Sequence, residues 1–332
     1  MTYISNLNIA YDGANGSISG VSSINKFGRN PDIDTTTDPE DIWDGGGIYE
    51  PPTTDRIHQI KSSEAQDQGT LKSNGTATGG SLSTLVDTGA TFSTDGVAVG
   101  DVVLDDDNQD HSIVTAVTSE TELAIRTMHH GNGFENGVAY RVINPSGTGA
   151  CVVHIKQGYE EDGTEHTEFI ILNGTTNVAT VNSYYRITRM HIHGAGSNTT
   201  NVGNITATAD TDTTVTAQIS ADQGQTLMAF YHVPIGKTGY ITNIYATMNR
   251  SGAVSGAMAD ISLRSRLWGN GNDGDIIEGY FNVAVEGGTF QKNYIPYKRI
   301  SQGTDVWIRC EGVTDNNTDI SAGFDIIIRD ND

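Results

Sequence analysis

The stretch that decides the fold runs from residue 304 to residue 328 and reads TDVWIRCEGVTDNNTDISAGFDIII. It contains two apolar runs separated by a polar segment rich in Asp, Asn and Thr. Alternate positions of the two runs are apolar: Val306, Ile308 and Cys310, and then Phe324, Ile326 and Ile328. Apolar side chains that recur every second residue indicate strands with one buried face. The stretch therefore predicts two half-buried antiparallel strands.

The same alternation occurs in the residues before this stretch, so that the whole segment 218–332 reads as strands. The apolar residues that share a parity there are Ile261, Leu263 and Leu267, and then Phe281, Val283 and Val285. Further strand-like runs occur at Met228–Val233 and Tyr240–Met248. Seven or eight strands in about 115 residues predict a β-sandwich of the jelly-roll type.

Residues 68–145 resemble a separate small module inserted into a larger domain. Its strand-like runs are Ser83–Val86, Asp101–Leu104, Ser112–Val117, Glu122–Arg126 and Val138–Val142. Gly, Asp and Asn clusters separate these runs, which predicts five short strands in a small barrel or sandwich. The linker-like sequences 66–69 and 145–149 flank the module, so we expect both ends of the insertion to meet the same domain.

That larger domain is expected to combine sequence from both sides of the insertion. Strand-like runs resume at Ala150–Lys156, Glu168–Leu172, Val178–Thr180 and Tyr184–His193. We expect them to pair with strands from the first 66 residues, a segment that is otherwise irregular and rich in turn formers. No amphipathic helix pattern is present. The sequence thus predicts an all-β chain of three units: 1–67 with 146–217, the barrel-like module 68–145, and the sandwich 218–332.

Composition excludes several classes of function. The chain has 332 residues with 19 basic and 41 acidic side chains, and its formal net charge is −22. A chain this acidic is not expected to bind nucleic acid, because phosphate binding requires Lys and Arg to displace counterions. It also lacks basic clusters for anionic lipid, an apolar run near 18 residues and a signal-like N-terminus, so no membrane partner is expected.

Histidines provide the best candidate metal ligands. His191 and His193 share one face of an expected strand and could chelate together, with Glu165, His166 and His58 as ligands that the fold could add. The alternative is that the pair faces solvent while Met190 and Ile192 face the core, and we predict no metal site here. His129-His130 reads as an exposed loop tip.

Acidic clusters are a second possible source of ligands. The run 105–110, DDDNQD, lacks the Gly and Glu of an EF-hand loop and is interpreted as a solvated hairpin tip. The run 272–275, NDGD, is interpreted as a plain hairpin turn.

Enzyme signatures are missing from the sequence. It contains no Gly-x-Ser-x-Gly motif, P-loop or dinucleotide fingerprint after any expected strand. Glu160-Glu161 precedes an ordinary Asp-Gly turn, and a glycosidase carboxylate pair among the 41 acidic residues is not excluded. Cys151 and Cys310 each fall in an apolar alternation and are interpreted as core residues, with one disulfide as the alternative. We predict no enzyme, no catalytic residue and no cofactor.

The N-terminal arm, residues 1 to about 55, has too few apolar residues to form its own core. It nevertheless contains Phe27, Trp43 and Tyr49. Aromatic side chains are common anchors in interface pockets. We therefore expect these three residues to anchor the arm, with Trp43 largely buried. The anchoring surface is either the sandwich or a neighbouring subunit; alternatively, the arm is the irregular first edge of its own domain.

Two phrases in the arm carry a resemblance to a known family: 25–34, NKFGRNPDID, and 40–49, EDIWDGGGIY. The similarity continues at 62–67, 147–150, 170–176, 186–189, 195–197, 201–206 and 233–238. These motifs resemble those of a family of tailed-bacteriophage virion structural proteins. The resemblance covers most of the chain apart from about 68–145, and that insertion resembles a small β-module of phage tail and capsid accessory proteins. The shared motifs are structural, so no catalytic residue is carried over.

The resemblance implies a non-enzymatic capsid decoration, cement or head-fibre protein located in the virion and assembled in the host cytoplasm. Its implied partners are two further copies in a homotrimer, and the major capsid protein or other virion proteins. Sheet edges with only seven lysines to protect them also favour self-association. The alternatives are a tail, adaptor or baseplate component that contacts the host and, from a different class, a carbohydrate-binding or depolymerising β protein.

Overall fold

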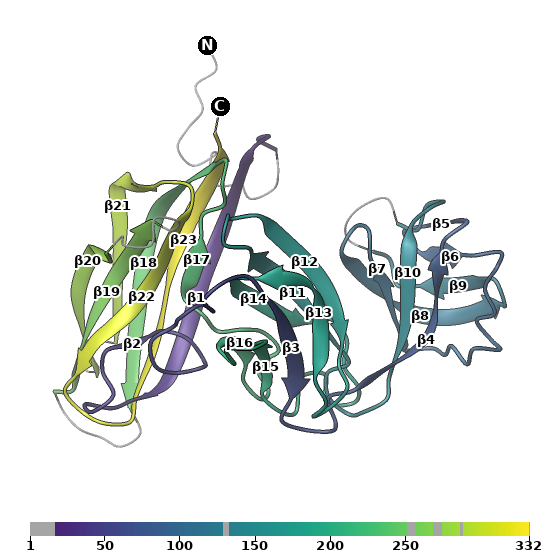
Figure 1. Ribbon diagram of the computed structural model, residues 1–332, viewed down its shortest axis with the longest axis horizontal. Coiled ribbons are helices and arrows are strands. Elements are labelled where there is room, and N and C mark those ends of the chain that lie inside the picture. Colours follow the sequence, from purple (N-terminus) through teal and green to yellow (C-terminus); the bar gives the residue numbers. More distant parts are fainter. Residues whose placement is uncertain (1–16, 129–132, 251–255, 268–273, 286–287, 332) are drawn as a thin grey trace, which may run out of the picture.

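The computed structural model describes residues 17–128, 133–250, 256–267, 274–285 and 288–331. Strands make up 60% of it and the described residues contain no α-helix, so the all-β prediction is confirmed. Three β units lie in a row, with the C-terminal sandwich at one end, a middle unit beside it and the inserted module at the other end (Figure 1). Among the described residues, no helical segment has the length and apolar character needed to cross a bilayer.

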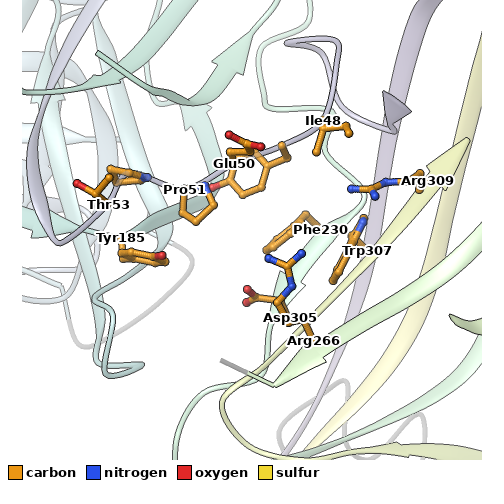
Figure 2. Close-up of a pocket in the computed structure, with 12 residues that line it drawn as sticks. Ile48, Glu50, Pro51, Thr53, Tyr185, Phe230, Arg266, Asp305, Trp307 and Arg309 are labelled. Carbon is orange, nitrogen blue, oxygen red and sulfur yellow. The ribbon is translucent and has the colours of Figure 1, made fainter. Parts of the chain in front are cut away.

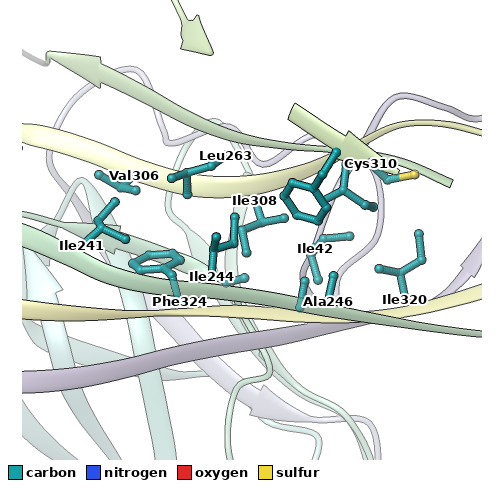
Figure 3. Close-up of a cluster of buried hydrophobic side chains, with 14 of the residues drawn as sticks. Ile42, Ile241, Ile244, Ala246, Leu263, Val306, Ile308, Cys310, Ile320 and Phe324 are labelled. Atoms are coloured by element: carbon teal, nitrogen blue, oxygen red, sulfur yellow. The ribbon is translucent and has the colours of Figure 1, made fainter. Parts of the chain in front are cut away.

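The sandwich consists of two antiparallel sheets. The first has the order β1 (Val21–Ile33), β23 (Thr318–Asp330), β18 (Lys237–Arg250), β21 (Thr289–Ile300). The second has the order β17 (Phe230–His232), β22 (Thr304–Val313), β19 (Met258–Leu267), β20 (Ile276–Ala284), and the short strand β2 (Glu40–Asp41) also pairs with β22. One hydrophobic core lies between these sheets (Figure 3).

The period of two in the sequence accounts for this core. All six alternating residues of β22 and β23 that opened the sequence analysis are buried in it. Ile261, Leu263, Phe281 and Val283 join them, and Val285 packs at the margin. Leu267 departs from the prediction: it ends β19 and is 44% exposed.

The middle unit also has two sheets around one core. Their orders are β12 (Glu165–Ile171), β11 (Val152–Tyr159), β14 (Arg186–Ile192), and β13 (Val178–Tyr184), β3 (Arg56–Ser62), β15 (Ile205–Ala209), β16 (Val215–Ile219). Ile60 of β3, Ile155 of β11 and Ile205 of β15 are among the fully buried residues between them. As predicted, sequence that precedes the insertion pairs with sequence that follows it.

The inserted module is one continuous sheet rather than a barrel. Its order is β4 (Gly69–Thr76), β10 (Ala139–Pro145), β7 (Val102–Asp105), β8 (Asp110–Ser119), β9 (Glu122–Ile125), β6 (Thr84–Val86), β5 (Gly79–Ser81). The two end strands, β4 and β5, are not paired with each other, so the sheet does not close and the barrel-like expectation is corrected. Gly69 pairs with Pro145, so the chain leaves and re-enters the middle unit at neighbouring points.

Strand pairing divides the N-terminal segment differently from the predicted grouping of 1–67 with 146–217. Strand β1 pairs with β23 and β2 pairs with β22, so both belong to the C-terminal sandwich, whereas β3 belongs to the middle unit. The long strand β1 escapes sequence analysis because three of its four buried positions are Lys26, Gly28 and Asn30, and only Ile33 at its end is apolar. A Cβ on Gly28 would lie 2.4 Å from the backbone of Ile42 and Ala229, so only glycine fits this close approach.

Buried polar contacts join the sandwich to the middle unit. The guanidinium of Arg186 on β14 donates to Asp305 on β22 at 2.9 Å, and His232 Nδ1 lies 2.7 Å from the other oxygen of that carboxylate. Lys26 on β1 donates to the carbonyl oxygen of Thr188 at 2.7 Å. Such groups require specific partners when buried, so they set the orientation of the two units relative to each other.

Candidate functional site

Residues 34–55, which we call the strap, connect the first strand of the sandwich to the middle unit. Within the strap, β2 pairs with β22, and Trp43 forms a backbone bridge with Met228. Trp43 Nε1 donates to the carbonyl oxygen of Gly47 at 3.1 Å. The strap is therefore tied down by main-chain pairing and closes on itself through a side chain.

An aromatic cluster buries the strap against the sandwich. Its buried members are Trp43, Tyr49, Met228, Phe230 and Trp307. Ring centroids are 5.5 Å apart for Trp43 and Tyr49, in an edge-to-face arrangement, and 4.7 Å apart for Tyr49 and Phe230. Such pairs add stability beyond the area they bury. The predicted burial of Trp43 is confirmed.

An ion pair supports the same contact. Arg309 on β22 donates to both carboxylate oxygens of Asp41, at 2.6 and 3.1 Å, and Tyr49 N donates to Asp41 at 2.8 Å. Burial raises the pKa of the Asp41 carboxyl group, and Arg309 opposes that shift. A two-point guanidinium–carboxylate pair fixes geometry as well as charge, so it sets the register of the strap on β22.

The three predicted anchors thus have different environments. Trp43 and Tyr49 are buried by their own chain, whereas Phe27 is half-buried on β1. Contact of any of them with a neighbouring subunit stays a prediction.

A pocket of about 320 Å³ opens where the strap, the sandwich and the middle unit meet (Figure 2). Tyr49, Phe230 and Trp307 line its wall, but each ring is less than a tenth exposed and offers no open face for a sugar ring to stack on. The buried carboxylate of Asp305 already accepts from Arg186 and pairs with His232. The pocket is therefore a junction between units, and its buried polar groups are already paired with one another.

The predicted pair His191 and His193 lies in a histidine cluster that the sequence did not reveal. His154 on β11 is paired with His191 in the strand register. One ring nitrogen from each of His154, His191 and His193 lies within 4.8 Å of the other two. His111, from β8 of the inserted module, approaches His193 with 2.7 Å between their Nδ1 atoms. Met190 and Ile192 face the core, as the alternative expected, but His191 and His193 are only partly exposed because the cluster lies where the module meets the middle unit.

Burial keeps the three clustered rings neutral. It lowers the pKa of His154 to about 3, of His191 to about 4 and of His193 to about 2, and the charges of neighbouring rings and Lys156 add to the effect. A neutral imidazole has a lone pair available for a metal ion.

The other residues considered as ligands lie elsewhere. His166 contacts Glu160 at 3.0 Å, Glu165 accepts from Tyr159 at 3.4 Å, and His58 is buried against the carbonyl oxygen of Arg56 at 2.9 Å. None of them joins the histidine cluster among the residues that the structure describes.

The two acidic runs are described to different extents. Residues 105–110 form the hairpin between β7 and β8, as predicted, and Asp106 there pairs with Arg141 at 2.6 Å. Of the run 272–275, Gly274 and Asp275 are described, and Asp275 accepts from Arg266 at 2.6 Å. Asn272, Asp273 and the pair His129-His130 lie outside the described residues. Cys151 and Cys310 are buried and unbridged, which confirms the core interpretation.

An apolar surface lies on the edge strands of the sandwich. Strand β21 bulges away from β18, because four residues, 294–297, intervene between the pairs Asn243–Asn293 and Ile241–Lys298. Ile295 on this bulge is 91% exposed, and Tyr297 is about half exposed. Ile276, Ile277 and Tyr280 of β20, the edge strand of the other sheet, are also exposed. Exposed apolar groups concentrated on two edge strands are typical of an interaction surface.

Comparison with known proteins gives no assignment: no family model matches this sequence, and no significant match is found among curated proteins.

Proposed function

We propose that this chain is a non-enzymatic structural protein of a tailed-bacteriophage virion, of the capsid decoration, cement or head-fibre kind. The observation that carries the proposal is the strand order of the C-terminal sandwich. Its eight main strands in chain order are β1, β17, β18, β19, β20, β21, β22 and β23. One sheet contains the first, eighth, third and sixth of them, and the other contains the second, seventh, fourth and fifth.

This order is that of a jelly roll, an architecture recurrent in viral capsid proteins and in lectins. The middle unit and the module are both inserted between its first and second strands. The buried aromatic rings of the pocket favour the viral class over the lectin class, because they are not open for stacking. The resemblance of the arm and of the middle unit to phage virion proteins supports the same class.

The oligomer that we propose is a homotrimer. The apolar bulge of β21 and the exposed residues of β20 are the surface that a neighbouring copy would cover. A charge of −22 is compatible with a high local copy number, since like-charged subunits repel outside their specific contacts.

The oligomer is tested with one substitution and a matched control. Ile295→Lys places a charge at the centre of the apolar bulge, and Val181→Lys places one on a residue of the middle unit that is 85% exposed. Light scattering after size exclusion at micromolar concentration is expected to give a trimer for the wild type and Val181→Lys, and a monomer for Ile295→Lys. A wild-type monomer would overturn the trimer.

The virion assignment has its own experiment. Purified protein is sedimented with empty capsids and with isolated tails from the phage that encodes it, and mass spectrometry examines purified particles for the chain. Co-sedimentation with capsids is expected. Binding to tails alone would instead support the adaptor or baseplate alternative, and absence from particles would overturn the proposal. For the carbohydrate-binding or depolymerising alternative, the protein is also sedimented with host polysaccharide. Binding there without binding to capsids would support that alternative.

A further inference from the structure

The histidine cluster is built by strand geometry rather than by a flexible loop. His154 and His191 are cross-strand partners in the β11–β14 pair, and His193 follows on the same face as His191. Residues two apart on a strand share a face, and directly paired residues have neighbouring side chains. The positions of the three rings are therefore set by the backbone of the middle unit.

Hydrogen bonding alone leaves this cluster incompletely satisfied. His154 Nδ1 lies 3.2 Å from His193 Nε2, and His193 Nδ1 lies 2.7 Å from His111 Nδ1. Whichever tautomer His193 adopts, it bonds one neighbour as donor and the other as acceptor. His154 Nε2 and His191 Nε2 are both buried without a hydrogen-bond partner. A buried polar nitrogen without a partner is costly, and an ion bound by Nε2 of His191 would remove that cost for this ring.

We propose that His154, His191 and His193 form a three-histidine site for a late first-row divalent cation of the Zn²⁺, Ni²⁺ and Cu²⁺ group, with His111 as an outer partner. Three nitrogens bound to one Zn²⁺ lie about 3.3 Å apart at bond lengths near 2.0–2.1 Å. His154 Nδ1 and His193 Nε2, which are 3.2 Å apart, already meet this condition, and we assign the unpartnered Nε2 of His191 as the third ligand atom. In this arrangement His193 binds the ion through Nε2 and donates its Nδ1 proton to His111, the kind of outer contact that orients metal-ligating histidines.

The ligand set determines which ions fit. Imidazole nitrogen suits Zn²⁺, Ni²⁺ and Cu²⁺, whereas Ca²⁺ and Mg²⁺ require oxygen ligands, and none of the three ligands is a carboxylate. The charged groups nearest the cluster include Lys156 and Arg189, whose positive charges oppose a dication, and Asp110, whose carboxylate lies 3.9 Å from His111. We therefore expect moderate affinity with a strong preference for late transition metals.

The site spans two units of the chain. Its three ligands come from the middle unit, and His111 comes from the inserted module. A bound ion would orient His193 toward His111 and so strengthen the contact of the module with the middle unit.

Titration calorimetry on the full-length, tag-free protein tests the proposal, with ZnCl₂, NiCl₂ and CaCl₂ as separate titrants. We expect one Zn²⁺ and one Ni²⁺ per chain, no binding of Ca²⁺, and a higher melting temperature with Zn²⁺. The variant His193→Asn should weaken Zn²⁺ binding by more than the about 10- to 100-fold that loss of an outer partner causes, and His111→Asn should weaken it within that range.

Two control variants separate this site from other histidines. His166→Asn removes a partly exposed histidine paired with Glu160, and His129→Asn/His130→Asn removes the adjacent pair; both should bind Zn²⁺ as the wild type does. Circular dichroism establishes that each variant is folded. Absence of Zn²⁺ and Ni²⁺ binding by the wild type, or unchanged binding by a folded His193→Asn variant, would overturn the proposal.

Discussion

At the scale of single residues, Arg186 links two units of the molecule, and it is the largest fully buried side chain among the described residues. Its guanidinium crosses from the middle unit to Asp305 of the sandwich. Removing one member of a buried ion pair leaves an uncompensated charge in a medium of low dielectric constant. We expect Asp305→Asn to lower the free energy of unfolding by about 3–5 kcal/mol.

A more exposed ion pair provides the control for this prediction. Arg29 and Asp319 are 2.7 Å apart, with side chains 41% and 21% exposed. Asp319→Asn should cost under about 1 kcal/mol because solvent already screens the pair. Chemical denaturation measures both values, and equal effects would mean that Arg186 finds another partner when Asp305 is neutral.

His58 gives a prediction for pH dependence. Its side chain is fully buried, and burial lowers its pKa from 6.5 to about 4. Between these two values the unfolded chain binds a proton that the folded chain does not, so stability falls as pH decreases from about 6.5 to about 4. His58→Gln should flatten the slope of unfolding free energy by about 1.4 kcal/mol per pH unit near pH 5. Denaturation from pH 4 to 8 measures this, and parallel curves for the two proteins would contradict it.

At the scale of elements, the strap forms only the two-residue strand β2, so buried side chains contribute much of its attachment to the sandwich. Trp43→Ala removes a buried indole from the aromatic cluster, and truncation of a buried Trp costs about 3–5 kcal/mol. We expect that loss of stability, together with faster proteolytic cleavage within residues 34–55, while the core between the sandwich sheets stays folded.

The matched control is Phe27→Ala on β1, since Phe27 is aromatic but only half-buried. It should cost clearly less than Trp43→Ala. Strap cleavage at the wild-type rate in Trp43→Ala would show that main-chain pairing and the Asp41–Arg309 ion pair hold the strap without the indole.

At the scale of the whole molecule, the inserted module should be removable. Ser146 N donates to the carbonyl oxygen of Gln68 at 3.1 Å, so the two ends of residues 69–145 are already adjacent. Replacing that segment with a short Gly-Ser turn should leave the middle unit and the sandwich folded, as circular dichroism and a single denaturation transition would establish.

Deleting the module should also lower the stability and solubility of the remaining chain. Cys151, Val152 and Phe169 pack against Val102, Leu104 and Ile143 of the module, so removing the module exposes apolar surface. We therefore expect lower stability and solubility than in the full chain. Loss of all cooperative unfolding would mean that the middle unit requires the module as part of its core.

The sequence by itself determined the features that depend on local patterns of apolar and turn-forming residues. The period-two apolar pattern of residues 304–328 and the turn residues between strands predicted an all-β fold, an insertion near 68–145 and most strands after it. These features are local, because side-chain alternation and turn propensity depend on neighbouring residues. The burial of both cysteines followed from the same alternation, whereas that of Trp43 followed from the composition of the arm.

Only the tertiary structure decided which distant segments pair. Strand β1 lies some 290 residues from its partner β23. Three of its four buried positions carry Lys26, Gly28 and Asn30, because they face backbone and polar partners of other elements. The histidine cluster has the same origin: His191 and His193 form a visible pair, but His154 and His111 join them through cross-strand register and docking of the module. Register and docking depend on the free energy of the complete core, and a one-residue shift would turn each of these side chains to the opposite face.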